Sequence, residues 1–173
     1  AGLHQRISVT NDSTQDMPFA LGFHTTFALP FVQGGRVEDV RLKLGVAEEI
    51  VRNMDTFLPT GEVIAASPLR QALLQGTLQP CMHTISRHFA MDASREMRLT
   101  DAVRGVQLIY RAQPPYAYWM LYNGGRKDLL CVEPQTWVNN CPNAPFDREK
   151  TGFQFLTPGE SRTYETQLTL TTC

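Results

Sequence analysis

Short apolar runs rich in β-branched and aromatic residues recur along the chain, and polar turn residues separate them. Polar and apolar positions alternate most clearly from Arg162 to Leu170, where the many threonines favour a half-exposed strand. Asn123-Gly124-Gly125 lies between two such runs and predicts a hairpin, because a tight loop needs residues that accept positive φ. The predicted strands are residues 5–10, 20–27, 38–45, 62–66, 82–89, 96–100, 106–110, 116–122, 127–132, 152–156 and 162–171. Their number and spacing predict an all-β fold of antiparallel sheet, either a sandwich or a barrel.

Helical patterns are scarce. The two best candidates are residues 46–54 and residues 68–75, and the second has Ser67 as its N-cap and Pro68 at its first position. We find no internal repeat, no low-complexity tract and no interdomain linker. A chain of 173 residues with 42% hydrophobic content can bury a core, so we expect one domain over residues 1–173.

The charges are nearly balanced. Lys and Arg number 16 against 17 Asp and Glu, and no long run of like charges occurs. This balance gives no support to nucleic acid or an anionic membrane surface as a partner. No apolar run approaches the roughly 20 residues needed to span a bilayer, and the first residues lack the apolar core of a signal peptide. We therefore expect a cytoplasmic protein with no nucleic-acid or membrane partner.

Four cysteines occur, at positions 81, 131, 141 and 173, and none forms a CxxC pair. Sparse cysteines of this kind fit a reduced, cytoplasmic protein. Cys81 lies close to His83 in sequence, and Cys131 lies close to Cys141, but neither spacing matches a structural zinc pattern. Buried or idle thiols are the simpler explanation, so we expect no metal site.

Glu133 follows a predicted strand and precedes Pro134. The proline fixes its own φ and biases the glutamate toward an extended conformation, so the end of the strand would aim the carboxylate in a defined direction. A carboxylate held in this way is a candidate general base. From spacing alone, the commoner explanation is a surface glutamate at a strand terminus.

His24 is the most interesting of the four histidines, because it stands among apolar and β-branched residues in Gly22-Phe23-His24-Thr25-Thr26-Phe27. Histidine ordinarily titrates near neutral pH and can either give or accept a proton there. A core histidine bonded to a backbone carbonyl is the alternative. His24 and Glu133 together offer an acid and a base.

Aromatic residues flank Glu133 on both sides in sequence, and flat rings pack well against the apolar face of a sugar. They are Tyr118, Trp119, Tyr122 and Trp137. Core packing is the alternative for at least half of them. Three asparagines follow Trp137 in a loop and could bond to hydroxyl groups or serve only as turn residues; they are Asn139, Asn140 and Asn143.

The segments around His24 and Glu133 belong to a larger ordered set. The set also contains Pro18-Phe19-Ala20-Leu21-Gly22, Phe57-Leu58-Pro59-Thr60-Gly61-Glu62 and Phe155-Leu156-Thr157-Pro158-Gly159-Glu160-Ser161. In this order the segments resemble the aldose 1-epimerase, or galactose mutarotase-like, family. The resemblance implies a large antiparallel β-sandwich, and the strand pattern agrees with it independently. It covers almost all of the chain but corresponds only to the later part of a family member, so we expect a sandwich that is incomplete at its N-terminal side.

The resemblance implies that His24 is the general acid on the ring oxygen of an aldose and that Glu133 is the base on the anomeric hydroxyl. Ring opening, rotation about the C1–C2 bond and closure would then interconvert the two anomers, with no metal and no organic cofactor. Substrate contacts would come from Trp119, Gln135 and Phe27. The family usually has a sugar-binding aspartate where this chain has Ser86, so Ser86 is the nearest equivalent for binding hydroxyls.

Two functions from different classes therefore compete. The first is an aldose 1-epimerase acting on a small-molecule aldohexose. The second is a non-catalytic carbohydrate-binding module that keeps the cleft. A structural β-sandwich interaction domain would rest only on the generality of the fold. In each case we expect a monomer or a homodimer.

Overall fold

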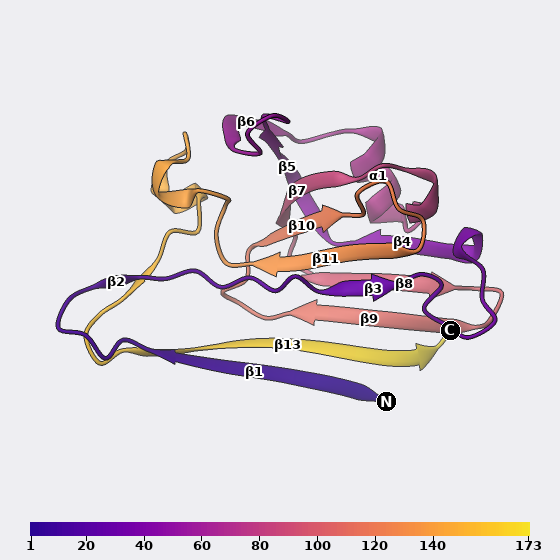
Figure 1. Ribbon diagram of the computed structural model, residues 1–173, viewed down its shortest axis with the longest axis horizontal. Coiled ribbons are helices and arrows are strands. Elements are labelled where there is room, and N and C mark those ends of the chain that lie inside the picture. Colours follow the sequence, from indigo (N-terminus) through magenta and orange to yellow (C-terminus); the bar gives the residue numbers. More distant parts are fainter.

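Two antiparallel sheets packed face to face make up most of the computed structural model, which describes residues 1–173 (Figure 1). The five-stranded sheet has the order β1 (Gly2–Thr10), β13 (Ser161–Thr172), β9 (Val106–Ala112), β8 (Glu96–Asp101) and β4 (Val40–Leu44). The six-stranded sheet has the order β3 (Thr26–Ala28), β11 (Leu129–Gln135), β10 (Tyr118–Tyr122), β7 (Ser86–Met91), β5 (Val46–Arg52) and β6 (Pro59–Ile64). A small third sheet pairs β12 (Phe155–Leu156) with β2 (Met17–Pro18). The predicted all-β antiparallel sandwich is confirmed.

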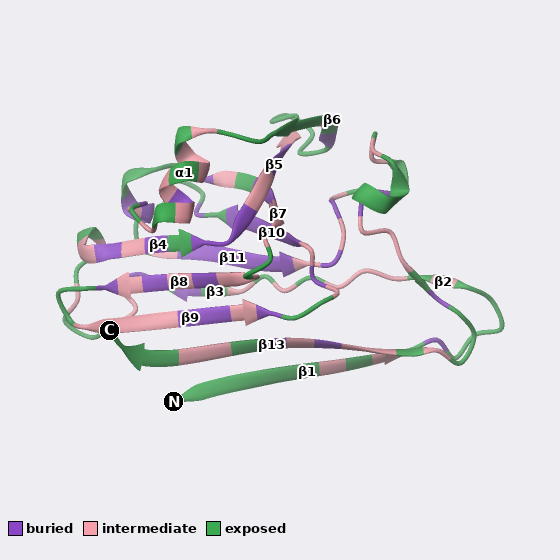
Figure 2. Ribbon diagram, turned by 180° about the vertical axis from the view of Figure 1, so that it is seen from behind, coloured by how far each residue is buried: buried purple, intermediate pink, exposed green.

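The core lies between the inner faces of the two large sheets. Because successive side chains of a strand point to opposite faces, only alternate residues of each strand enter this core. The six-stranded sheet contributes Phe27, Phe89, Trp119, Leu121, Leu130 and Val132, and the five-stranded sheet contributes Leu42, Leu44, Met97, Leu99, Tyr110 and Tyr164. Figure 2 shows the resulting contrast between β10 and β11, which are largely buried, and the outermost strand β1, which is largely exposed. Cys131 and Glu133, which alternate with the core residues of β11, are buried as well.

One α-helix, α1 (Pro68–Gln75), connects β6 to β7, as the sequence predicts. Ser67 caps it by accepting a hydrogen bond from Arg70 N at 3.1 Å, and Gly76 ends it with a φ of 72°. Short 3-10 helices cover Val37–Asp39, Pro80–Met82, Cys141–Asn143 and Arg148–Lys150. None of the helices has the length and apolarity needed to cross a bilayer.

The prediction of a helix over residues 46–54 is wrong, because residues 46–52 form strand β5. Alanine and glutamate favour a helix locally, but β5 pairs with β7 on one side and with β6 on the other. The ladder bonds to both neighbours outweigh a propensity of a few tenths of a kcal/mol per residue. Both pairings of β5 contain register shifts. Such irregularities interrupt the alternation of polar and apolar residues that would predict a strand from the sequence.

Of two predictions for segments next to the candidate site, the turn at residues 123–125 agrees with the structure and the strand over residues 20–27 does not. Residues 123–128 do connect β10 to β11, and Gly124 and Gly125 have φ values of 59° and 76°, as a tight turn requires. The long strand expected over residues 20–27 is reduced to β3 and one isolated bridge between Gly22 and Gln135. The stretch in between follows β11 without regular pairing, and it carries His24.

Candidate active site

Glu133 stands inside strand β11 rather than after its end, which corrects the predicted strand boundary. It pairs with Met120 of β10, and Met120 pairs in turn with His88 of β7. Residues that are directly opposite in a sheet share a face, so these three side chains form a row across the face turned away from the core. Val132, which precedes Glu133, points into the sandwich instead, and by alternation along the strand Pro134 faces the same way.

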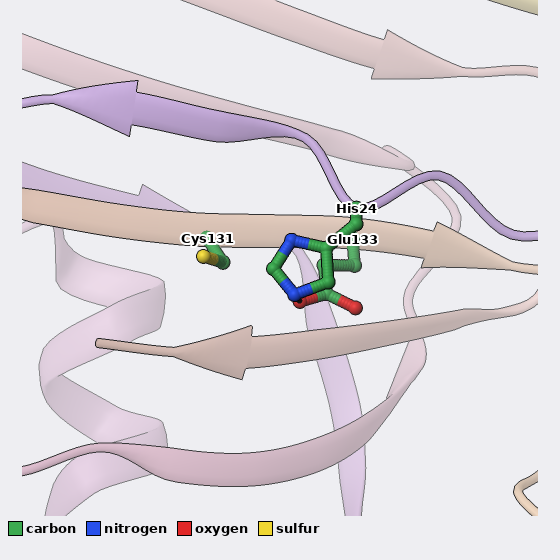
Figure 3. Close-up of side chains that lie close together, drawn as sticks. All are labelled: His24, Cys131 and Glu133. Carbon is green, nitrogen blue, oxygen red and sulfur yellow. Dashed lines mark ion pairs between the residues drawn. The ribbon is translucent and has the colours of Figure 1, made fainter. Parts of the chain in front are cut away.

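The backbone brings His24 opposite Glu133. Residues on either side of the histidine bond to residues on either side of the glutamate: Phe23 N donates to Pro134 O at 3.1 Å, and Val132 N donates to Thr25 O at 3.0 Å. The segment is fixed further along where Leu21 O accepts a bond from Thr136 N at 3.0 Å. The result is a distance of 3.3 Å between His24 Nε2 and Glu133 Oε1 (Figure 3).

The two partners differ in their exposure. The side chain of His24 is 70% exposed, whereas that of Glu133 is only 10% exposed. Burial raises the pKa of the Glu133 carboxyl, while the nearby charges of His24 and Arg52 act in the opposite direction. A carboxylate with a raised pKa is a stronger base than an ordinary glutamate. The arrangement therefore joins a shielded base to an acid that solvent and substrate can reach.

Arg52, at the end of β5, is a residue of this face that the sequence analysis missed. Its Nη2 donates a hydrogen bond to Ser86 Oγ at 2.9 Å, and its charge acts on Glu133. Burial lowers the pKa of its guanidinium, although arginine stays charged at any physiological pH. Only the pairing of β5 with β7 brings Arg52 here, and no motif in the sequence signals it.

His88 is the second residue missed. It is fully buried, its ring centroid lies 5.5 Å from that of Tyr118, and neither ring nitrogen has a hydrogen-bond partner. Burial, together with a smaller contribution from the positive charge of Arg52, lowers the pKa of His88 to about 3. The imidazole is therefore neutral at physiological pH and adds no positive charge beside the acid and the base.

The predicted substrate contacts divide into two groups. Ser86 lies on the same outer face as Glu133, where it pairs with Tyr122 and bonds to Arg52. Gln135 lines a hollow of about 160 Å³ together with Gly22, Trp137 and Asn139. Gly22 and Gln135 each stand two residues from a member of the His24–Glu133 pair, but neither His24 nor Glu133 itself lines the hollow.

Trp119 and Phe27 do not belong to this face, which corrects two predicted substrate contacts. Trp119 is 0% exposed and its Nε1 donates to Gly45 O at 3.2 Å, while Phe27 is 7% exposed and packs edge-on against Tyr110. Both rings point into the core because they alternate with residues of the outer face. The tryptophan that does border the hollow is Trp137, which stacks on Phe153 at 5.9 Å between centroids.

One group of potential metal ligands coincides with the acid–base pair. Ligand atoms of His24, Cys131 and Glu133 all lie within 4.8 Å of one another (Figure 3). Cys131 precedes Glu133 by two residues on the same face of β11, which explains their proximity. All four cysteines are free thiols, and Cys173 alone is exposed.

Comparison with known proteins shows the family of the chain. A family model for aldose 1-epimerase matches residues 1–169. The chain belongs to the aldose 1-epimerase family. The resemblance drawn from the ordered motifs is thereby confirmed.

Solved structures of this family superimpose on nearly the whole chain. A galactose mutarotase-like protein from Clostridium acetobutylicum gives a TM-score of 0.93 at 29% identity, covering 98% of this chain and 52% of its own. A provisionally assigned aldose 1-epimerase from Escherichia coli gives a TM-score of 0.78 at 22% identity, covering 99% of this chain and 57% of its own. A galactose 1-epimerase from Lactobacillus acidophilus gives 0.66 at 18% identity, covering 99% and 53%. The chain thus spans little more than half the length of these structures.

Proposed function

We propose that this chain interconverts the α and β anomers of a free aldohexose by acid–base opening and closure of the sugar ring. The observation that carries the proposal is the pairing of Glu133 Oε1 with His24 Nε2 at 3.3 Å on the outer face of the sheet. Mutarotation needs one group that removes a proton and one that supplies a proton, and both must reach the same sugar. Membership of the aldose 1-epimerase family supports this reaction class.

Each group has a defined task in the proposed cycle. Glu133 removes the proton of the C1 hydroxyl while His24 protonates the ring oxygen, so the C1–O5 bond breaks and an open aldehyde forms. Rotation about the C1–C2 bond presents the other face of the aldehyde. His24 then takes the proton back from the C5 hydroxyl, Glu133 returns its proton to the carbonyl oxygen, and the ring closes as the other anomer. Both groups end the cycle in their starting states.

The surroundings of Glu133 suit this task. Burial raises its pKa, which strengthens it as a base, while the positive charge of Arg52 limits the rise and keeps a fraction ionised at lower pH. Arg52 is itself held by Ser86, so its position relative to the carboxylate is fixed. Burial and the positive charge of Arg52 thus act on the pKa of Glu133 in opposite directions.

The substrate would lie over the His24–Glu133 pair and extend toward Gln135. The hollow of about 160 Å³ beside the pair is smaller than the roughly 300 Å³ of typical small-molecule sites, so most of a hexose would lie outside it. Gln135 and Asn139 supply amide groups for sugar hydroxyls, and Trp137 supplies a partly exposed aromatic ring. The descriptions of the relatives as galactose mutarotase-like and galactose 1-epimerase favour galactose as the first sugar to test.

Polarimetry of freshly dissolved α-D-galactose and α-D-glucose tests the proposal. The chain should accelerate the approach to the equilibrium rotation, and Glu133→Gln should remove the acceleration. Glu38→Gln is the matched control, because Glu38 is an exposed glutamate in a 3-10 helix away from the site. No acceleration by the intact chain, or equal acceleration by Glu133→Gln, would refute the proposed function.

A carbohydrate-binding module without turnover is the second candidate. Ser86 replaces the aspartate usual in the family, and its hydroxyl is engaged by Arg52, which favours altered recognition of sugar hydroxyls. Isothermal titration with galactose separates the two candidates. Binding without acceleration of mutarotation would identify the module, whereas acceleration that depends on Glu133 would identify the enzyme.

A further inference from the structure

We propose that His24, Cys131 and Glu133 form a binding site for a divalent ion of the zinc class, and that an ion bound there inhibits the sugar chemistry. The inhibitory part rests on the proposed function, whereas the binding part rests only on geometry. The ligand atoms of the three residues lie within 4.8 Å of one another, and both Cys131 and Glu133 are buried. The group therefore differs from the clusters of exposed acidic side chains that are common on protein surfaces without an ion.

The three donors match the preferences of zinc. Thiolate, imidazole and carboxylate are its usual protein ligands, at distances of about 2.0 to 2.3 Å. A soft thiolate selects zinc-class ions over magnesium and calcium, which prefer oxygen ligands. The thiol releases its proton to the solvent when the metal–sulfur bond forms. With three protein ligands the fourth position stays open, as in zinc sites that bind water or a substrate.

Thr26 on the neighbouring strand β3 orients two of the three ligands. Its Oγ1 lies 3.3 Å from His24 Nδ1 and 3.3 Å from Cys131 Sγ. In the metal-binding state, Nδ1–H donates to this oxygen and the threonine O–H donates to the thiolate. Such a bond on the second ring nitrogen is the usual companion of a metal-bound histidine, and it leaves Nε2 free for the ion. Nε2 is the nitrogen that already faces Glu133.

The backbone makes closure of the site feasible. Cys131 and Glu133 lie two residues apart on the same face of β11, so the strand fixes two ligands on a rigid element. Tetrahedral bonds of about 2.1 Å place ligand atoms roughly 3.4 Å apart, so separations of up to 4.8 Å must shorten by up to about 1.4 Å. The 70% exposed side chain of His24 has the freedom to supply this movement. Its exposure also gives the ion a path from solvent.

Occupation of the site would stop both proton transfers. The ion takes the carboxylate lone pair with which Glu133 would accept the C1 proton, and it takes the Nε2 atom from which His24 would protonate the ring oxygen. Loss of mutarotation should therefore follow the fraction of chains that carry metal. Magnesium and calcium should have little effect because the thiolate discriminates against them.

Titration with Co²⁺ tests the binding part without any sugar. Cobalt coordinated by a thiolate gives a near-ultraviolet charge-transfer band, so the native chain should develop this band at one equivalent of ion. Cys131→Ser should lose the band and weaken Zn²⁺ binding, measured by competition with a chromogenic chelator, by at least about tenfold. Thr26→Val should keep the band but weaken binding by roughly tenfold. Cys173→Ser is the control, because it removes the exposed thiol and should bind as the native chain does.

The outcomes separate this proposal from the proposed function. A band that survives in Cys131→Ser, or no band in the native chain, would overturn the metal site whatever the enzyme does. If polarimetry shows turnover, Zn²⁺ should inhibit the native chain and Cys173→Ser at concentrations at least about tenfold below those needed for Cys131→Ser. Equal inhibition of all three would overturn the inhibitory role. A metal site in a chain without turnover would leave the binding part intact and refute only the proposed function.

Discussion

Glu133 and His24 approach each other to 3.3 Å, yet their side chains are 10% and 70% exposed respectively. The difference follows from where each residue stands. Glu133 belongs to a strand with ordered neighbours on both sides, whereas His24 belongs to an irregular segment bonded along the edge of that strand. Burial thus acts mainly on the base, and it raises the pKa of Glu133 while leaving the acid within reach of solvent.

The pH dependence of turnover should show the raised pKa of the buried Glu133 carboxyl. Because the pKa of Glu133 is raised, kcat/KM should fall on acidification at a pH above the ordinary glutamate pKa of about 4.3. Arg52→Gln removes a positive charge that lowers this pKa, so its acid limb should move to higher pH. Polarimetric pH profiles of both chains measure the shift. Arg36→Gln, which alters an exposed arginine paired with Glu38, should leave the limb in place, and a shift equal to that of Arg52→Gln would contradict the assignment.

Glu133→Gln should separate activity from stability. Loss of a general base should lower turnover by about 10²-fold or more. The folded chain binds the Glu133 proton more tightly than the unfolded chain does. The free energy of unfolding therefore falls as pH rises from the pKa of the unfolded chain through the raised pKa of the folded chain. Glutamine carries no such cost, and the variant should therefore unfold at an equal or higher temperature at pH 7. Differential scanning calorimetry measures this, and a clear drop in Tm would show that the carboxylate is needed for the fold.

The sequence predicts the sandwich because the strand signal is repeated many times. Errors arise where pairing decides the structure: residues 46–52 have helix-forming alanine and glutamate but lie between two strands, and residues 20–25 follow β11 without forming a strand. These secondary-structure predictions fail because hydrogen bonds between segments far apart in the sequence outweigh the local preferences of the residues. The same bonds bring His24 and Glu133 together.

The site was only partly predictable for the same reason. Motifs predict Glu133 and His24, whereas Arg52 and His88 carry no motif and lie at the candidate site only because of the order of the strands. The prediction of Trp119 as a substrate contact conflicts with its burial in the core, because closeness in sequence to Glu133 does not tell which face of the sheet a residue occupies. That question is settled by register, since a shift of one residue exchanges the two faces.

The two tryptophans should therefore respond to substitution in opposite ways. Trp119→Ala should lower the free energy of unfolding by about 3 to 5 kcal/mol, because the ring is fully buried in the core. Trp137→Ala should cost much less stability, since its ring is only partly buried, but it should raise KM for the sugar with kcat less affected. Urea denaturation and polarimetric kinetics give the two readouts. Equal effects of both substitutions on KM would restore Trp119 as a substrate contact.

His88 should make the fold sensitive to acid. Its pKa is lowered to about 3 by burial, with a smaller contribution from Arg52, whereas the unfolded chain binds the proton near the ordinary value of 6.5. Below pH 6.5 the unfolded state therefore holds more protons, and stability falls as pH decreases toward 3, by about 2 kcal/mol between pH 6.5 and pH 5.

His88→Phe keeps an aromatic ring beside Tyr118 and removes the titrating group, so it should lose about 2 kcal/mol less than the native chain on going from pH 7 to pH 5. Urea denaturation at the two pH values gives the difference, with His83→Gln, at an exposed position, expected to behave as the native chain does. If His88→Phe lost as much stability in acid as the native chain, the buried imidazole would have to be protonated in the folded state.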